Sequence, residues 1–444
     1  MKPALFHAQR AMRDQLRSAL KRGLLGLIDI GTAKTACFIL RIDPGRLAAS
    51  SRQEAHLGGF GALRVVGAGV TRSRGVRLGE IVEMEECERA IRTALQAAEK
   101  MAGLRVDQVI GALSGAHPVS FGATGEAEVL SGEVAEGDVA LALAACPSPS
   151  LDEDREVLHA LPVNFTVDGH SFLADPRGMT GERLSADMHV LSVAGAPLRN
   201  LARCVRRCDL ELAGVVAAPY AAALASLVED EQELGAACVD MGAGATGVSI
   251  FLRRQLIFAD AARVGGQHVT RDVAEAFGIE GALAERIKTL HGGVMATSLD
   301  DRELISAPPI GAPEGHDRRI SRAALIGVIR PRLEEIFEET RTLLDRAGFA
   351  SLPSRRIVLT GGASQLPGLE DVARRVLGQR VRVGRPLRVS GLPQSATGPA
   401  FSAVVGLAAY AVRPLDEVWD FEAPANLGSA TKLRRAARWF RDNW

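Results

Sequence analysis

The sequence has no Cys-x-x-Cys pair, and its histidines show no spacing typical of metal ligands. A disulfide scaffold is therefore excluded, and we expect small buried thiols in a reducing cytosol at Cys37, Cys87, Cys146, Cys204, Cys208 and Cys238. The N-terminus lacks the continuous apolar segment of a signal peptide. No stretch approaches the roughly 20 apolar residues that cross a bilayer. We therefore expect a protein of the cytosol or of a membrane surface.

Net charge is also missing, because 53 basic and 53 acidic side chains cancel in 444 residues. This balance argues against a nucleic-acid partner bound by bulk positive charge. The cancellation hides an uneven distribution. Residues 1–22 carry a net charge of +5 and residues 431–444 carry +4, which leaves −9 for residues 23–430. The three tryptophans all lie in the last 26 residues.

Hydrophobic periodicity and turn residues predict alternating strands and helices over a length sufficient for two or three domains. We expect strands at 24–30, 35–41, 109–113, 156–167, 188–193 and 356–360, and helices at 1–22, 83–102, 266–277, 281–291, 322–347 and 369–377. Segments 43–61 and 298–318 are expected to be loops. Asp138 is expected to cap a short alanine-rich helix, and Pro331 to kink or divide the helix that contains it.

Two segments repeat one pattern: an apolar strand, Asp, one apolar residue, Gly, small and hydroxyl residues, and a second apolar strand. The first runs from Leu27 to Thr35 and the second from Cys238 to Thr246. Their aspartates, Asp29 and Asp240, are 211 positions apart. This repeat suggests two related half-domains.

Both turns suit a phosphate clamp, because glycine turns let backbone N–H groups approach phosphate oxygens and hydroxyls add donors. Two carboxylates at strand ends can hold a hydrated Mg²⁺ from opposite sides, so Asp29 and Asp240 are candidate metal residues acting through water. The candidate phosphate residues are Gly31, Thr32, Lys34, Gly242, Gly244 and Thr246. One such hairpin alone would be an ordinary glycine turn, and it is not a P-loop.

A third element follows, in which the strand from Ile357 opens through Gly361 and Gly362 towards a helix. That turn would let the backbone approach a nucleoside. Glu285 and Lys288 lie three positions apart on one predicted helix face and suit ribose hydroxyls and adenine. Taken alone, the pair is more typical of a solvated ion pair. The three elements in this order are more specific than any one of them.

In sequence, the three elements resemble the phosphate-1, phosphate-2 and adenosine segments of the actin/Hsp70/sugar-kinase superfamily. Within it the chain resembles the FtsA family of bacterial cell-division proteins over about residues 24–413 and the terminal helix. Segments 111–117, 157–162 and 175–181 resemble the extra subdomain of that family, which kinases and chaperones lack. The resemblance implies an actin-like, two-lobed α/β fold with duplicated half-domains, and ATP with Mg²⁺ between the lobes.

The resemblance also implies a division of the chain. A basic N-terminal extension covers 1–23; subdomain 1A covers 24–106, 191–225 and 385–413; subdomain 1C covers 107–190; subdomain 2A covers 226–263 and 330–384; subdomain 2B covers 264–329; a linker covers 414–430; and a membrane-binding amphipathic helix covers 431–444. The N-terminal extension is additional to the family pattern. It suits either a solvated, partly disordered arm or a second membrane contact.

The chain departs from the family in the segments tied to hydrolysis. Where phosphate-2 segments of the family carry a threonine and then an acid, this chain has Ala245 and Gly247. Where many ATP-hydrolysing relatives place Glu before a proline, it has Ala218. A missing carboxylate removes the group that would orient an attacking water. We therefore expect nucleotide binding with slow or absent hydrolysis, at most a weak ATPase.

The last fourteen residues predict an interfacial membrane helix. On a helical wheel Leu433, Ala437, Phe440 and Trp444 fall within about 60 degrees of one another, opposite a basic face, and Trp439 lies off this face near its boundary. The candidate membrane residues are Leu433, Arg434, Arg435, Arg438, Trp439, Phe440, Arg441 and Trp444. Each basic residue contributes roughly 1 kcal/mol near an anionic surface. The alternative is a helix packed on its own domain, against which the acidic linker argues.

The resemblance implies a scaffold that polymerises with copies of itself, binds the C-terminal tail of FtsZ and connects to later septal membrane proteins. Its place would be the cytoplasmic face of the inner membrane at the septum. FtsZ tails are partly acidic, so Arg318, Arg319 and Arg322 are candidate contacts, although they equally describe a solvated basic face. The alternatives are a small-molecule phosphotransferase, which needs a carboxylate near Ala218, and a pilus-assembly protein without the terminal anchor.

Overall fold

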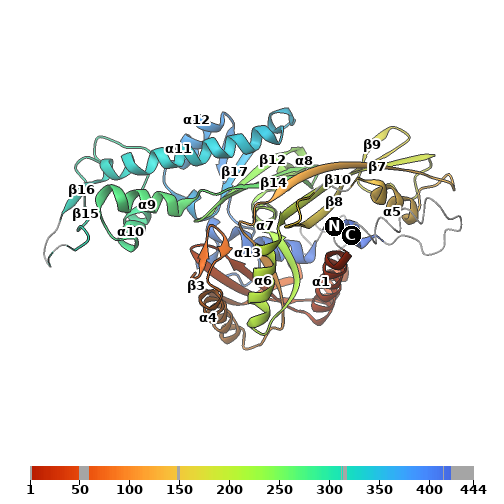
Figure 1. The fold of residues 1–444 in the computed structure, drawn as a ribbon, viewed down its shortest axis with the longest axis horizontal. Helices are drawn as coiled ribbons and strands as arrows, with labels where there is room; N and C mark the ends of the chain where they lie inside the picture. The colour runs from red at the N-terminus through yellow and green to blue at the C-terminus, as the bar shows by residue number, and fades with distance from the viewer. Residues whose placement is uncertain are drawn as a thin grey trace.

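The computed structural model describes residues 3–49, 60–147, 151–311, 313, 318–413 and 415–421. It has two lobes, each built on a five-stranded sheet, and a smaller inserted subdomain with a four-stranded sheet (Figure 1). Each of the three parts has its own cluster of buried apolar side chains. The cleft between the lobes is the feature that this arrangement creates.

The first lobe carries a sheet in the order β11-β6-β1-β2-β3. Its strands are β1 (Leu24–Ile30), β2 (Lys34–Ile42), β3 (Leu63–Arg72), β6 (Gln108–Leu113) and β11 (Glu211–Ala217). The first three are antiparallel neighbours, while β6 and β11 run parallel to β1. β1 and β6 are buried over nearly their whole length, as expected of strands covered on both faces.

The second lobe repeats this topology, with the order β14-β13-β12-β17-β18. Its strands are β12 (Ala236–Met241), β13 (Thr246–Leu252), β14 (Gln255–Ala262), β17 (Arg356–Thr360) and β18 (Arg380–Val383). Again three antiparallel strands are followed by two parallel ones. The duplication expected from the two aspartate segments is therefore confirmed by the strand pairing.

The inserted subdomain has the sheet β7-β10-β8-β9. Its strands are β7 (Val119–Glu128), β8 (Arg155–Val167), β9 (His170–Leu173) and β10 (Arg183–Ala194), and helix α5 (Glu136–Ala145) packs on β7. Sequence patterning found β8 and part of β10 but missed β7, whose inward positions are mostly alanine and glycine. Asp138 lies in the first turn of α5 rather than before it, where its carboxylate accepts the Ala135 N–H at 2.9 Å.

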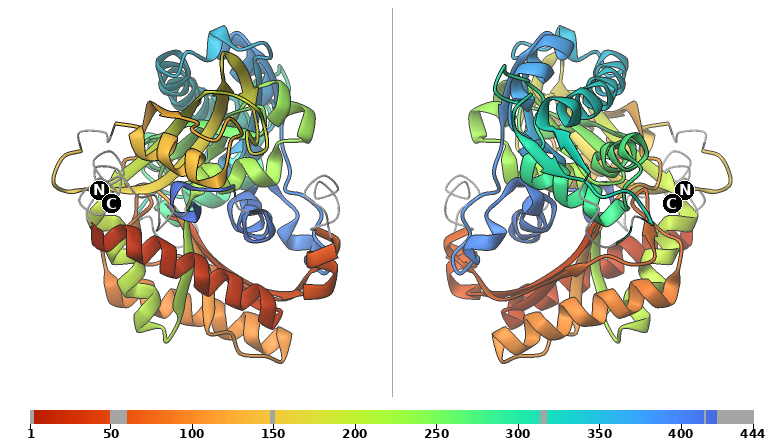
Figure 2. Two further views of the ribbon diagram at one scale, coloured as in Figure 1. Left: turned by 90° about the vertical axis from the view of Figure 1, so that its right-hand side faces the viewer. Right: turned by 90° about the vertical axis from the view of Figure 1, so that its left-hand side faces the viewer.

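Helices fill the space between the lobes and cover their outer faces (Figure 2). α7 (Ala218–Ser226) and α13 (Ser402–Val412) pack together between the two sheets, and α4 (Met84–Ala102) and α6 (Gly195–Arg207) pack on the first lobe. The second lobe carries α8 (Glu229–Leu234), α9 (Gly266–Phe277), α10 (Gly281–His291), α11 (Arg322–Arg346) and α12 (Leu369–Leu377). α11 runs unbroken through Pro331, so the division allowed by the sequence is absent.

Short elements occupy the two segments expected to be loops and the cleft edge. α2 (Pro44–Ala49) lies within 43–61, and β15 (Leu304–Ser306) lies within 298–318 and pairs with β16 (Arg319–Ser321). A small hairpin of β4 (Val76–Arg77) and β5 (Glu80–Ile81) borders the cleft. In the part of the chain that the structure describes, no helix is long and apolar enough to cross a membrane.

Both ends of the described chain belong to the folded body. Helix α1 (Pro3–Arg22) packs on β11, with Leu16 and Ala19 in the core of the first lobe, so residues 9–22 are not a solvated arm. Residues 415–421 were expected to be linker, yet Val418 and Trp419 are buried in the core of the inserted subdomain. The predicted helix at 431–444 lies outside the described residues.

Candidate functional site

The two predicted phosphate turns have the same geometry. In the first lobe the Gly31 N–H donates to the Lys34 carbonyl at 3.0 Å, and in the second the Gly242 N–H donates to the Ala245 carbonyl at 3.0 Å. Each turn joins two antiparallel strands directly after its aspartate. Both turns line one cleft, with a cavity volume of about 1290 Å³. The tertiary structure therefore brings the repeated segments together.

Asp29 and Asp240 line this cleft from opposite lobes, and the pKa of each is raised. Burial is the main cause for both. The pKa of Asp240 reaches about 7 because the charge of Asp29 adds to burial, while Lys34 acts in the opposite direction. Two carboxylates that repel each other at low dielectric fit a divalent cation, which would stabilise both ionised forms.

The side chains nearest the first turn are already engaged with the protein. Thr32 Oγ1 accepts a hydrogen bond from the Gly79 N–H at 2.8 Å. The Lys34 ammonium group donates a hydrogen bond to the Ala400 carbonyl. Gly244 faces Thr32 across the cleft so closely that a Cβ there would lie 2.3 Å from Thr32 Oγ1. Glycine at 244 is thus required by the approach of the two phosphate turns.

The third element lies beside the second aspartate. Gly361 has φ +85°, and a Cβ at this position would lie 2.4 Å from Asp240 Oδ1. Gly361 and Gly362 both line the cleft. The glycine pair therefore serves two purposes, because it turns the chain in the left-handed region and leaves the carboxylate room.

Glu285 and Lys288, for which the sequence allowed either nucleoside contacts or an ion pair, form an ion pair. Both residues also line the cleft. Lys288 Nζ lies 2.7 Å from Glu285 Oε2, 2.8 Å from Thr270 Oγ1 and 3.0 Å from the Gly266 carbonyl. Partial burial opposes ionisation of Glu285, but Lys288 and neighbouring hydroxyls outweigh it, so the pKa of Glu285 is lowered. The ion pair does not exclude a contact with a nucleoside, because both residues border the cavity.

The prediction that Thr246 would contact phosphate is wrong. Thr246 is fully buried, and its hydroxyl donates to the Val264 carbonyl at 2.8 Å, so it does not line the cleft. At the neighbouring position a Cβ on Gly247 would lie 2.3 Å from Pro219 Cγ. Ala245 and Ala218 both line the cleft. Small, non-ionisable residues therefore occupy all three positions, 218, 245 and 247, at which the sequence departs from the family pattern.

Sequence reasoning also missed part of the site. Gly265 and Gly266 begin α9 against the second turn, where the Gly266 N–H donates to the Gly242 carbonyl at 2.9 Å. A Cβ on Gly265 would lie 2.6 Å from that carbonyl. Thr270, one turn further along α9, links this contact to Lys288. The Gly-Gly pair ahead of a predicted helix was the available signal.

The three arginines suggested for an acidic partner differ in their surroundings. Arg318 donates to the Phe277 carbonyl, and Arg322 donates to the His291 carbonyl at 2.9 Å and to Asp300. Both therefore hold their own subdomain together. Arg319 is exposed on β16.

The fold and the cleft define the class of protein: an actin-like, two-lobed protein. Solved structures show the same architecture at low identity. A PilM–PilN type IV pilus biogenesis complex matches with a TM-score of 0.59 at 16% identity, covering 88% of this chain and 99% of that one. MreB5 of Spiroplasma citri bound to ADP matches with a TM-score of 0.50 at 14% identity, covering 87% and 95%. These likenesses concern the fold alone.

Sequence comparison identifies the family within that class. The model of cell division protein FtsA matches residues 237–406, and the model of the SHS2 domain inserted in FtsA matches residues 115–192. Cell division protein FtsA of Rhizobium meliloti is 41% identical over 95% of both chains. The Pseudomonas aeruginosa protein is 31% identical over 94% of this chain and 97% of its own. The chain belongs to the FtsA family of cell-division proteins.

Proposed function

We propose that this protein binds ATP with Mg²⁺ in the cleft and hydrolyses it slowly or not at all. The observation that carries the proposal is the pairing of Asp29 and Asp240 at the ends of two identical turns. Glycine turns would receive the phosphates, and Gly361, Gly362, Glu285 and Lys288 would border the nucleoside. The absence of a carboxylate at 218 and 247 supports slow hydrolysis.

Binding of ATP to the full-length protein tests this proposal, measured with Mg²⁺ and again with EDTA. Asp240→Ala is expected to abolish the Mg²⁺-dependent affinity, whereas Asp371→Ala, on the exposed surface of α12, should retain it. Retained Mg²⁺-dependent affinity in Asp240→Ala would contradict the site. A single-turnover hydrolysis rate comparable to that of actin would contradict the slow ATPase.

The second part of the proposal is peripheral attachment to an anionic membrane through residues 431–444. A basic face opposite an apolar face that carries Phe440 and Trp444 favours the interface of a bilayer. Flotation of vesicles of phosphatidylethanolamine and phosphatidylglycerol should carry the full-length protein upwards and leave a 1–430 truncation below. Equal flotation of the two proteins would remove the anchor from the proposal.

The third part is the role in division, where the protein would anchor FtsZ filaments to the cytoplasmic face of the inner membrane at the septum. It would also polymerise with itself and recruit later septal proteins. Support comes from the family and from exposed apolar side chains of the segment 264–329, at Leu290, Met295, Leu299, Leu304 and Ile310. Because contiguous exposed apolar patches are typical of interaction sites, we take these side chains as the candidate contacts.

A peptide of the FtsZ C-terminal tail tests this surface. Leu299→Ser and Ile310→Ser are expected to weaken peptide binding, and Arg319→Ala tests the exposed arginine. Leu130→Ser is the matched control, because Leu130 is a leucine of the inserted subdomain that is even more exposed than Leu299. If the control weakens binding as much as the two test variants, the peptide does not dock on 264–329.

A further inference from the structure

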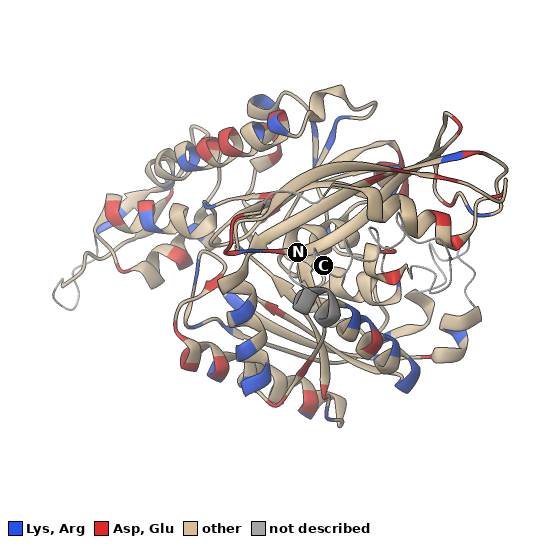
Figure 3. Cartoon of the chain, turned by 45° about the vertical axis from the view of Figure 1, so that its right-hand side comes forward, with Lys and Arg blue, Asp and Glu red and all other residues tan. Residues whose placement is uncertain are grey.

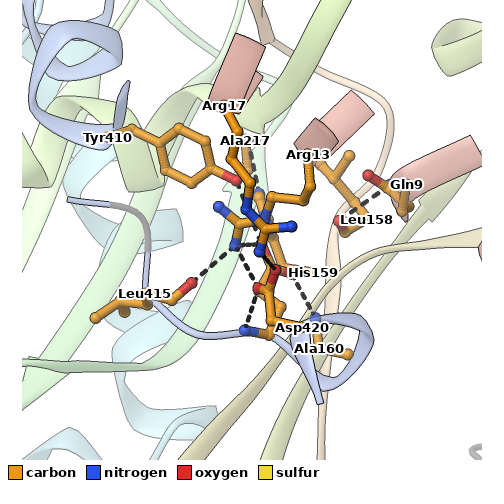
Figure 4. A network of polar contacts seen from close by, with 11 residues as sticks. Gln9, Arg13, Arg17, Leu158, His159, Ala160, Ala217, Tyr410, Leu415 and Asp420 are labelled. Atoms are coloured by element: carbon orange, nitrogen blue, oxygen red, sulfur yellow. Dashed lines mark hydrogen bonds and ion pairs between the residues drawn. The ribbon is translucent and has the colours of Figure 1, made fainter. Parts of the chain in front are cut away.

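The two ends of the described chain are joined by a buried ion pair. Arg13 of α1 places one guanidinium nitrogen 3.2 Å from Glu417 Oε1 and 3.3 Å from Asp420 Oδ2. The same nitrogen donates to the Leu415 carbonyl at 2.8 Å. The Arg13 and Glu417 side chains are only 6% and 1% exposed. Figure 4 shows α1 and the segment 415–421 meeting at this cluster.

Glu417 is also bonded to the inserted subdomain. Its second oxygen accepts the Ala160 N–H at 3.1 Å, and its first lies 3.2 Å from His159 Nδ1. The Ala217 N–H donates to His159 Nε2 at 3.2 Å, so that nitrogen is an acceptor and Nδ1 carries the proton given to Glu417. The cluster thus ties β8 of the inserted subdomain and β11 of the first lobe to the C-terminal segment.

The segment is held by packing as well as by charge. Val418 and Trp419 are buried in the core of the inserted subdomain, and Tyr410 of α13 donates its hydroxyl to Glu417 at 3.3 Å. On the other side, Arg17 pairs with Asp420 at 3.0 Å from an exposed position on α1. Figure 3 shows basic residues distributed along α1. Two of these cations face the acids of 415–421, so they compensate charge within the fold.

We propose that α1 is a clasp that fixes the segment 415–421 and thereby sets the reach of the chain that follows. With the clasp closed, nine residues (422–430) separate the body from the predicted membrane helix, an extended reach of about 30 Å. With it open, the last held element is α13, and seventeen residues (414–430) would reach about 60 Å. A short tether raises the effective concentration of the body at the membrane and restricts its orientation.

This inference rests on the proposed membrane attachment for its consequence, but the clasp itself is tested without lipid. Hydrogen exchange of residues 415–421 is measured in the full-length protein. Arg13→Gln and a deletion of residues 1–22 are expected to accelerate exchange there about tenfold or more, while β6 keeps its protection. Lys21→Gln, which removes an exposed cation of the same helix outside this cluster, is the matched control and should leave the segment protected.

The consequence is measured on vesicles of phosphatidylethanolamine and phosphatidylglycerol by energy transfer from a dye on the second lobe to a lipid dye. Arg13→Gln is expected to lower the transfer efficiency at unchanged flotation, and Arg13→Lys to give an intermediate value. Global destabilisation alone would not lengthen the separation of bound, folded protein. Unchanged transfer in Arg13→Gln would overturn the control of reach.

The two failures are distinguishable. If 415–421 stays protected in both Arg13→Gln and the deletion, the clasp is wrong whatever the protein does on membranes. If the wild-type protein does not float, the proposed attachment is wrong, and the exchange result still decides the clasp.

Discussion

Asp240 and Gly361 are in such close contact that no side chain fits between them: a Cβ on Gly361 would lie 2.4 Å from Asp240 Oδ1. The residue that would hold Mg²⁺ and the turn that would border the nucleoside are therefore positioned by one contact. β12, which carries Asp240, and β17, which ends directly before Gly361, are parallel neighbours paired from Ala236 to Asp240. Changes at either residue should act on both metal and nucleotide.

Gly361→Ala should weaken Mg²⁺–ATP binding by at least about tenfold, because the new methyl group displaces the Asp240 carboxylate. It also carries a backbone cost of about 1–3 kcal/mol, because φ +85° with ψ 168° is a conformation that essentially only glycine adopts. Gly378→Ala is the matched control, since Gly378 also has positive φ (+64°) but has no atom near its added Cβ. Calorimetric titration with ATP separates the two costs. Equal losses of affinity in both variants would refute the contact.

The pH dependence of metal binding follows from Asp240. Because its pKa in the folded protein is raised to about 7, the side chain is protonated in more acidic solution and cannot hold the cation. Mg²⁺-dependent ATP affinity should therefore rise with pH between about 6 and 8. Asp240→Asn should lose this dependence, which isothermal titration at several pH values would show. A flat profile in the wild type would contradict the carboxylate pair.

The same raised pKa predicts an effect on the nucleotide-free protein. The protonated carboxyl favours the folded state below the unfolded pKa of 3.8, and this contribution is lost as pH rises through about 7. At pH 8 the free energy of unfolding of Asp240→Asn should therefore exceed that of the wild type by at most about 4 kcal/mol, at 1.36 kcal/mol per pKa unit, and the variant should melt at a higher temperature. Asp371→Asn is the control and should leave the melting temperature at pH 8 unchanged.

His189 predicts a loss of stability in acid. It is buried between β10 and the second lobe, and its Nε2 lies 2.9 Å from Ser120 Oγ, which in turn accepts the Ala259 N–H at 2.8 Å. Burial, with the nearby His159, lowers the pKa of His189 to about 3. Stability should therefore fall as pH drops below about 6.5, by up to roughly 1.4 kcal/mol per pH unit.

Urea unfolding at pH 7.5 and pH 5 checks this expectation. His189→Asn should reduce the difference between the two pH values, whereas His170→Asn, on the exposed strand β9, should keep it. A wild-type stability independent of pH in this range would show that His189 is not held neutral by the fold.

Gly247 should not tolerate the acid that the family pattern places there. A Cβ would lie 2.3 Å from Pro219 Cγ, so Gly247→Asp should destabilise the protein by about 1–3 kcal/mol and not restore hydrolysis. Pro219→Ala should relieve part of that cost in the double variant. Thermal unfolding of the four proteins of the cycle provides the measurement. Additive costs would mean that the contact with Pro219 is not the cause.

Local pattern predicted much of the fold because its signals are short-range. The bounds of β1 and α12 agree with those expected, since apolar runs and helical spacing end at glycine turns in both. The paired turns were predicted for the same reason, because Gly31 and Gly242 occupy equivalent places in a repeated segment. Edge strand β7 was missed, since its inward positions after Phe121 are Ala123, Gly125 and Ala127, whose small side chains give little hydrophobic signal.

The sequence by itself determined the duplicated half-domains, the two aspartates and the glycine turns, because the signal for each lies in repeated segments of about ten consecutive residues. Only the tertiary structure decided what the uneven charge means. Arg13 and Glu417 are 404 positions apart, and no local pattern relates them, yet burial together is what makes each tolerable in the core. The same is true of Thr246, whose hydroxyl turns to Val264 because β13 fixes the direction of its side chain. The basic start of the chain is therefore part of the folded body, and the charge total concealed a contact.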